Sequence, residues 1–217
     1  MIRVALMVFS LFICAVSAFP QDPVVTVYYY ERMPFFGQAN TDDEGCILAI
    51  TRYVLEEANI PFRFEKMPVS RIFELMKKSD ANACFPGVFM NPERQCLYVY
   101  SDLPIYQDTP PHYVIRKSDE QLYAGVDSID GLLGLGKTLG LVVSYSHGLW
   151  VDDAIRRCNP NRVFVNIGDN QLNFYRMILA NRFDFFFASE EESRYIVRND
   201  HEFSDKLAIR ELPDAPE

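Results

Sequence analysis

The sequence predicts an α/β protein built from two α/β units that an extended crossing joins. Short β-branched and aromatic runs alternate with segments whose apolar residues recur at helical spacing. The alternation stops once, at the extended segments Leu97–Ser101 and His112–Arg116 and the prolines between them, and restarts after Gln121. A chain of 217 residues that is 49% hydrophobic and 24% charged has a globular composition, and its size accommodates two small lobes.

The first eighteen residues are predicted to be a cleavable signal peptide. Arg3 supplies the positive end, Val4–Val16 form an apolar core, and Val16-Ser17-Ala18 offer small residues for cleavage. A membrane anchor would need about twenty apolar residues, more than this run provides. We therefore expect export, which places the cysteines in a compartment that permits disulfides. Two hypotheses stay open for Cys84 and Cys96, a disulfide across one short loop or buried thiols.

The first unit is predicted to alternate strand and helix three times. The β-branched, aromatic or helically periodic runs that predict these elements are Val24–Tyr30 (strand), Glu44–Ala58 (helix, capped by Asp42 or Asp43), Pro61–Lys66 (strand), Val69–Met76 (helix) and Ala83–Val88 (strand). Asn91 then caps a short turn that has Pro92 at its first helical position. Such alternation favours a largely parallel sheet.

The second unit follows the same pattern after the crossing. Its predicted elements, again strand and helix in turn, are Leu139–Val143, Gly148–Arg157, Arg162–Ile167, Asn170–Ala180, Phe183–Ala188 and Glu190–Arg198. Because α/β sheets bind ligands at their strand ends, a cleft between the two units is the expected binding region.

Several function classes are excluded or disfavoured. The net charge of −9 leaves no basic excess to neutralise nucleic-acid phosphates. Gly131–Thr138 matches the P-loop string, but a strand should precede it and a helix should follow, whereas the predicted order here is the reverse. The histidines are isolated and no metal-binding spacing is present, so we expect no metal and no cofactor.

Residues suited to ligand recognition lie at strand–helix junctions. Arg94 stands on a capped turn, where its guanidinium could take a carboxylate in a bidentate manner. Ser144–Gly148 lie between a strand and a helix, so hydroxyls and free helix N–H groups suit an anionic or polar ligand. Tyr28–Tyr30, Phe35 and Phe36 offer aromatic walls. Their joint placement predicts a binding cleft.

The mature chain resembles the type 2 periplasmic solute-binding proteins, in particular the family 3 proteins that include amino-acid receptors of ABC importers. The resemblance runs from about Val24 to Pro213, and the order and spacing of its motifs carry it: Tyr30–Phe36, Met67–Arg71, Asn91–Arg94 with Tyr100–Tyr106, and Ser144–Gly148. It implies a periplasmic, monomeric protein of two hinged lobes that trap a small ligand between them, without nucleic acid, for an inner-membrane ABC permease or a sensor.

The resemblance also assigns roles to individual residues. It implies that Arg94 grips a ligand carboxylate, that Tyr145 and Ser146 bind from the second lobe, and that the loop around Arg32 and Phe35 covers the ligand. Arg71, near the start of its helix, faces either the cleft or the surface, and both placements stay open.

The sequence departs from the family at two places. Amino-acid receptors hold the ligand ammonium with an acid where this chain has Ser189, followed by Glu190. Either Glu190 takes that role or the ligand is not a standard amino acid. The second departure is at the end of the sequence, where we expect only a shortened return to lobe 1. The expected division is a signal peptide at 1–18, lobe 1 at 19–113, lobe 2 at 114–206, and a second hinge with this shortened return at 207–217.

Two rival functions stay open beside solute binding. The same scaffold carries periplasmic enzymes such as dehydratases, in which Glu190 or Glu31 would act as acid or base. The other rival is a ligand sensor that signals to a membrane receptor without transport. Turnover of a candidate ligand would identify the enzyme, and a neighbouring permease or kinase gene would separate transport from sensing.

Overall fold

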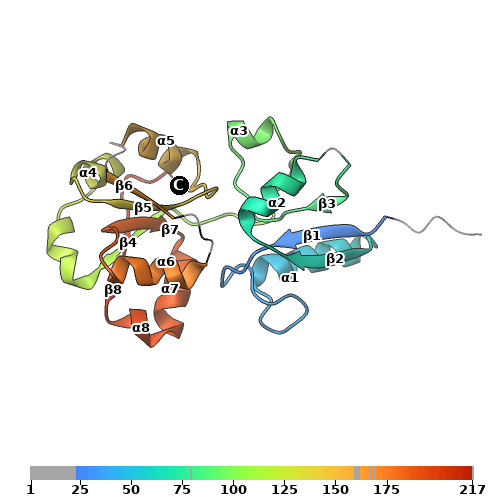
Figure 1. The fold of residues 1–217 in the computed structure, drawn as a ribbon, viewed down its shortest axis with the longest axis horizontal. Coiled ribbons are helices and arrows are strands. Elements are labelled where there is room, and N and C mark those ends of the chain that lie inside the picture. The colour runs from blue at the N-terminus through green and yellow to red at the C-terminus, as the bar shows by residue number, and fades with distance from the viewer. Residues whose placement is uncertain (1–22, 79, 159–161, 167, 169, 217) are drawn as a thin grey trace, which may run out of the picture.

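The computed structural model describes residues 23–216 except 79, 159–161, 167 and 169. It consists of two α/β units that lie side by side (Figure 1). A three-stranded sheet forms the centre of the first unit and a five-stranded sheet that of the second. The predicted signal peptide lies outside the described residues.

The first unit has a parallel sheet in the order β2-β1-β3. Its elements are β1 (Val25–Tyr29), α1 (Cys46–Glu57), β2 (Phe62–Lys66), α2 (Val69–Met76), β3 (Ala83–Cys84) and α3 (Pro92–Gln95). The predicted cap of the last helix is confirmed, because the Asn91 side chain accepts a hydrogen bond from the backbone N–H of Arg94 at 2.9 Å.

Two predicted boundaries in this unit are wrong for local reasons. The first helix is not capped by Asp42 or Asp43. Gly45, at φ 83°, lets the chain turn back so that the N–H groups of Cys46 and Ile47 donate to the Pro34 and Phe35 carbonyls. The third strand ends at Cys84 because Pro86 has no N–H to donate and Gly87 has a positive φ of 69°.

The second unit has its sheet in the order β6-β5-β7-β4-β8. Its elements are β4 (His112–Arg116), the 3-10 helix η1 (Lys117–Tyr123), α4 (Ile129–Gly134), β5 (Leu139–Val142), α5 (Leu149–Arg157), β6 (Val163–Asn166), α6 (Gln171–Leu179), β7 (Phe185–Ala188), α7 (Glu190–Asn199), α8 (His201–Ser204) and β8 (Leu207–Glu211). The P-loop-like string runs from α4 into β5, in the helix-then-strand order that the sequence indicates.

Residues 207–215 lie in the second unit rather than returning to the first. β8 pairs antiparallel with β4 over its whole length, from Leu207 opposite Arg116 to Glu211 opposite His112. Beyond it, both carboxylate oxygens of Asp214 accept the N–H of Ile129 at 3.1 Å, and Ala215 packs on the core of the second unit. Leu207 and Ala208 are buried, so burial of the strand holds this segment beside β4.

Each face of the five-stranded sheet has its own apolar core. One core gathers around Tyr113, Phe185 and Phe187, and the other around Val114, Tyr175 and Phe186. Because successive side chains of a strand point to opposite faces, the continuous apolar run of β7 serves both cores. None of the helices in the described part of the chain is long and apolar enough to cross a membrane.

The structure decides between a disulfide and free thiols for Cys84 and Cys96. Cys84 and Cys96 are both free thiols, and Cys96 is exposed. Burial raises the pKa of the Cys84 thiol to about 11, so this side chain behaves as a small apolar group at neutral pH.

Packing of α6 on the sheet can be tested with a matched pair of substitutions. Ile178 is fully buried, whereas Leu172 on the same helix is 38% exposed. Ile178→Ala is expected to lower the free energy of unfolding by about 2–5 kcal/mol, and Leu172→Ala by about 1 kcal/mol or less. Urea denaturation followed by circular dichroism measures both. Equal losses would contradict the described core.

Candidate functional site

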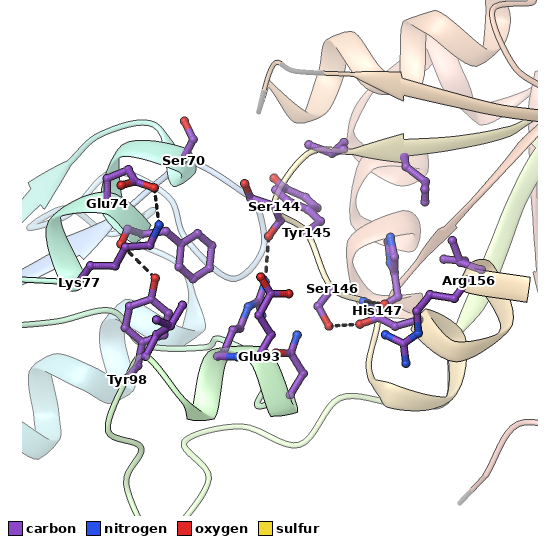
Figure 2. A pocket seen from close by; sticks show the side chains of 18 residues that line it. Ser70, Glu74, Lys77, Glu93, Tyr98, Ser144, Tyr145, Ser146, His147 and Arg156 are labelled. Carbon is purple, nitrogen blue, oxygen red and sulfur yellow. Dashed lines mark hydrogen bonds and ion pairs between the residues drawn. The ribbon is translucent and has the colours of Figure 1, made fainter. Parts of the chain in front are cut away.

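A cavity of about 470 Å³ lies between the two units. The first unit contributes α2, α3 and the chain after α3, and the second contributes the loop after β5 and helix α5. Figure 2 shows Ser70, Glu74, Lys77 and Tyr98 on one side and Ser144–His147 with Arg156 on the other. The volume is within the range of small-molecule sites. Of the predicted site residues, Arg94, Tyr145 and Ser146 line this cavity.

Arg94 reaches from the first unit to the second. Its guanidinium donates to the Phe89 carbonyl at 2.8 Å and, across the cavity, to the Ser144 carbonyl at 2.9 Å. The guanidinium carbon also lies 4.8 Å from the centre of the Phe73 ring, on which it stacks. Within the described residues no carboxylate forms an ion pair with Arg94. Its charge is therefore available to an anionic ligand.

The loop after β5 is fixed by one carboxylate. Asp152 of α5 accepts the Ser146 hydroxyl at 2.5 Å and the His147 N–H at 2.9 Å. The Ser146 oxygen in turn accepts the N–H of Gly148 at 3.3 Å. These contacts satisfy the N-terminal end of α5 and hold Tyr145 and Ser146 against the cavity.

Arg32 and Glu192 form a buried ion pair between the two units. Arg32 follows β1 and Glu192 lies in the first turn of α7. Both the Nε and an Nη atom of Arg32 donate to one carboxylate oxygen, Nε at 2.8 Å. Their side chains are only 20% and 8% exposed. Burial opposes the guanidinium charge, but the Glu192 carboxylate outweighs it and raises the pKa of Arg32.

Aromatic side chains surround this ion pair. The Arg32 guanidinium lies 5.4 Å from the Phe35 ring centre and 5.5 Å from that of Tyr145, and the Tyr145 ring lies 5.8 Å from Tyr30. Burial and the nearby Tyr30 raise the pKa of the Tyr145 hydroxyl, which stays protonated. Phe35 packs in the core of the first unit rather than lining the cavity between the units.

The other predicted residues lie elsewhere. Ser189 is buried and caps α7, its hydroxyl accepting the Glu192 N–H at 3.4 Å. Glu190 is paired with Arg194 one turn along the same helix. Arg71 is exposed on α2 and does not line the cavity.

Three residues of this region were missed by the sequence analysis. Glu192 was not singled out, although Ser189-x-x-Glu192 is a capping-box pattern that marks a helix N-terminus. His147 lies within the predicted Ser144–Gly148 loop but was not singled out, and Asp108 gave no local signal. Burial lowers the pKa of His147 to about 4 and raises that of the Asp108 carboxyl to about 6.

A second cavity, of about 610 Å³, lies wholly within residues of the first unit and is mostly apolar. Side chains of α1, α2 and the segment 83–106 line it, and Arg32 and Asp108 are also among its lining residues. Val99 and Leu103, on the same segment, are almost fully exposed. This cavity contains none of the hydroxyl-rich loop of the second unit.

Comparison with solved structures identifies the fold. The chain matches ArtJ, the arginine-, lysine- and histidine-binding protein of Geobacillus stearothermophilus, with a TM-score of 0.67 and 17% identity over 88% of this chain and 77% of that one. The chain has the two-lobed fold of periplasmic binding proteins. An ancestral arginine-binding protein bound to glutamine matches at TM-score 0.64 and 15% identity, over 89% and 80% of the two chains.

A third match is the histidine-bound substrate-binding protein of an ABC uptake transporter from Streptococcus pneumoniae, with TM-score 0.64 and 16% identity over 87% of this chain and 74% of that one. No family model and no curated protein matches the sequence. At these identities the likeness concerns the fold.

The ion pair between the units can be tested through stability. Glu192→Gln leaves the buried Arg32 without its carboxylate, and we expect it to lower the free energy of unfolding by about 3–5 kcal/mol. The double variant Arg32→Met/Glu192→Leu removes both charges and should recover much of that loss. Denaturant unfolding of the wild type, both single variants and the double variant measures the coupling. Additive effects of the two single changes would contradict the pairing.

His147 should make stability depend on pH. The groups that act on it are Asp152, Arg32 and Glu192. Its pKa is lower in the folded state, so the unfolded state binds the proton more readily between pH 6.5 and about 4. Stability from this group is complete above pH 6.5 and is lost as the pH falls through the folded-state pKa, by about 3 kcal/mol in all. His147→Gln should flatten this part of the curve of unfolding free energy against pH. The matched control is His201→Gln, which changes an exposed histidine and should leave the curve unchanged. Equal curves for wild type and His147→Gln would contradict the lowered pKa of His147.

Proposed function

We propose that this protein is an exported solute-binding protein that holds a small carboxylate-bearing ligand, of amino-acid size, between its two units. The observation that carries the proposal is Arg94, which lines a cavity between the units and has only backbone carbonyls and an aromatic ring as described partners. A guanidinium in a partly enclosed cavity binds a carboxylate through charge-assisted, often bidentate hydrogen bonds.

The second unit would complete the site through its hydroxyl-rich loop. Ser144, Ser146 and the Tyr145 ring line the cavity opposite Arg94. Because Asp152 holds Ser146 and the His147 backbone in place, the loop is ordered before a ligand binds, and preorganised groups lose less entropy on binding. A ligand that contacts both units would favour the arrangement in which they face each other.

The fold supports this function over catalysis. The matched structures of this fold are binding proteins for arginine, lysine or histidine, or hold glutamine or histidine. The residues considered for acid–base chemistry lie away from the cavity, since Glu190 pairs with Arg194 and Glu31 with Lys66. Delivery to an inner-membrane ABC permease, a monomeric state and a periplasmic location after cleavage at residue 18 are parts of the proposal.

Arg94→Met tests the carboxylate contact. A thermal-shift screen of amino acids and small organic acids first selects a ligand, since a bound ligand raises the melting temperature by mass action. Calorimetry with that ligand should then show binding weakened by about 2–4 kcal/mol in the variant. Arg63→Met is the matched control, because Arg63 is 65% exposed on β2 and lies outside the cavity. Unchanged affinity in Arg94→Met would refute the assigned role.

A further inference from the structure

The charges around the cavity between the units specify the ligand further. We infer that the site selects a carboxylic acid that lacks an α-ammonium group, such as a 2-hydroxy acid or a simple carboxylic acid, over the amino acid with the same side chain. The inference rests on the proposed function, in which Arg94 binds the carboxylate.

The cations that line the cavity are unequally partnered. Lys77 forms an ion pair with Glu74 at 2.6 Å, and Arg156 forms one with Asp153. Among the described lining residues, only the cation Arg94 has no carboxylate within ion-pair distance. The cavity therefore has one positive group to offer a ligand.

Among the described lining residues, two of the three acids are already engaged. Glu74 is bound to Lys77, and Asp152 accepts the Ser146 hydroxyl and the His147 N–H. Glu93 is exposed and lies near Lys77, whose pKa is raised by its hydrogen bond to Glu74 and also by the charge of Glu93. An exposed carboxylate that is screened by water and shared with a lysine holds an ammonium only weakly.

Glu190 and Glu192, at the start of α7, are engaged as well. Glu192 does not line the cavity, and one of its oxygens accepts two hydrogen bonds from Arg32. Glu190 is bound to Arg194, and the side chain at Ser189 is neutral. A ligand ammonium would therefore lose water and find, among the described acids that line the cavity, only the exposed Glu93 without an ion pair or hydrogen bond, which is a weak exchange. A hydroxyl or a hydrogen at the α-carbon of the ligand avoids this cost. The residues Ser70 and Ser144 line the cavity, and their hydroxyls suit a neutral polar substituent.

Matched ligand sets test the inference on the full mature protein. Each set has one side chain and three substituents at the α-carbon: L-glutamate, L-2-hydroxyglutarate and glutarate; L-phenylalanine, L-phenyllactate and 3-phenylpropionate; L-leucine, L-2-hydroxy-4-methylpentanoate and 4-methylpentanoate. Calorimetry should show the hydroxy acid or the unsubstituted acid binding at least about tenfold more tightly than the amino acid of its set.

The outcomes separate this inference from the proposed function. An amino acid that binds as tightly as its analogues, or more tightly, overturns the inference and leaves carboxylate binding by Arg94 standing. If no compound of any set binds, the proposed function fails and the inference fails with it.

Two variants identify the group that sets the preference. Glu93→Gln should leave the ratio of affinities within each set unchanged; a selective loss of amino-acid binding would show that Glu93 holds the ammonium and would overturn the inference. Arg32→Gln releases the Glu192 carboxylate and should shift the ratio toward the amino acid by about tenfold. Circular dichroism verifies that both variants fold. If Arg32→Gln does not fold, the affinity ratios measured for the wild type and for Glu93→Gln decide the question.

Discussion

The buried ion pair between Arg32 and Glu192 determines how the two units of this protein meet. Arg32 follows the first strand and Glu192 begins a late helix, so the contact joins parts of the chain that are 160 residues apart. A charge taken out of water must be compensated where it lies, and each partner here is compensated by the other. The rings of Tyr30, Phe35 and Tyr145 pack around the pair and cover most of it. The facing ends of β1 and α7 are thereby fixed.

That contact also divides the interface into two chemically different parts. Around Arg32 the charges are paired and covered by aromatic rings, so this part serves structure. Around Arg94 the guanidinium holds only carbonyl oxygens and a ring face. Carbonyl oxygens carry partial charge, so they satisfy the hydrogen-bonding groups of Arg94 without neutralising it. The net charge of −9 for the whole chain does not cancel this local excess, because screening limits such charges to about 10 Å.

The sequence predicted the elements more reliably than their contacts. Strand and helix alternation and the Asn91 cap were recognisable because each depends on neighbours in sequence. The start of α1 was not, because the groups that satisfy its N–H donors are carbonyls of the preceding loop. The same limit hid the pairing of β8 with β4, since a five-residue strand with only three apolar residues, Leu207–Ile209, is compatible with either unit.

In the candidate site, too, the sequence predicted local features more reliably than contacts. Arg94, Tyr145 and Ser146 were predicted because strand–helix junctions and a family resemblance identify them. Glu192 was not, because a glutamate in the first turn of a helix is usually a solvated partner of the helix dipole. Only the position of Arg32 in space shows that this carboxylate is already used. Local patterns thus indicate where ligand groups can bind, whereas the tertiary structure shows which of those groups remain available.

The two cavities differ in what an occupant could do to the molecule. The larger, apolar cavity is lined by residues of the first unit alone, so a molecule bound there would make no direct contact with the second unit. The smaller cavity is lined by both units, and a ligand in it gains contacts only when both units face it. Binding free energy changes a conformational equilibrium only through such differential contacts. Volume would favour the larger cavity as the functional site, but coupling between ligand and unit arrangement favours the smaller one, where the guanidinium of Arg94 lies without a described carboxylate partner.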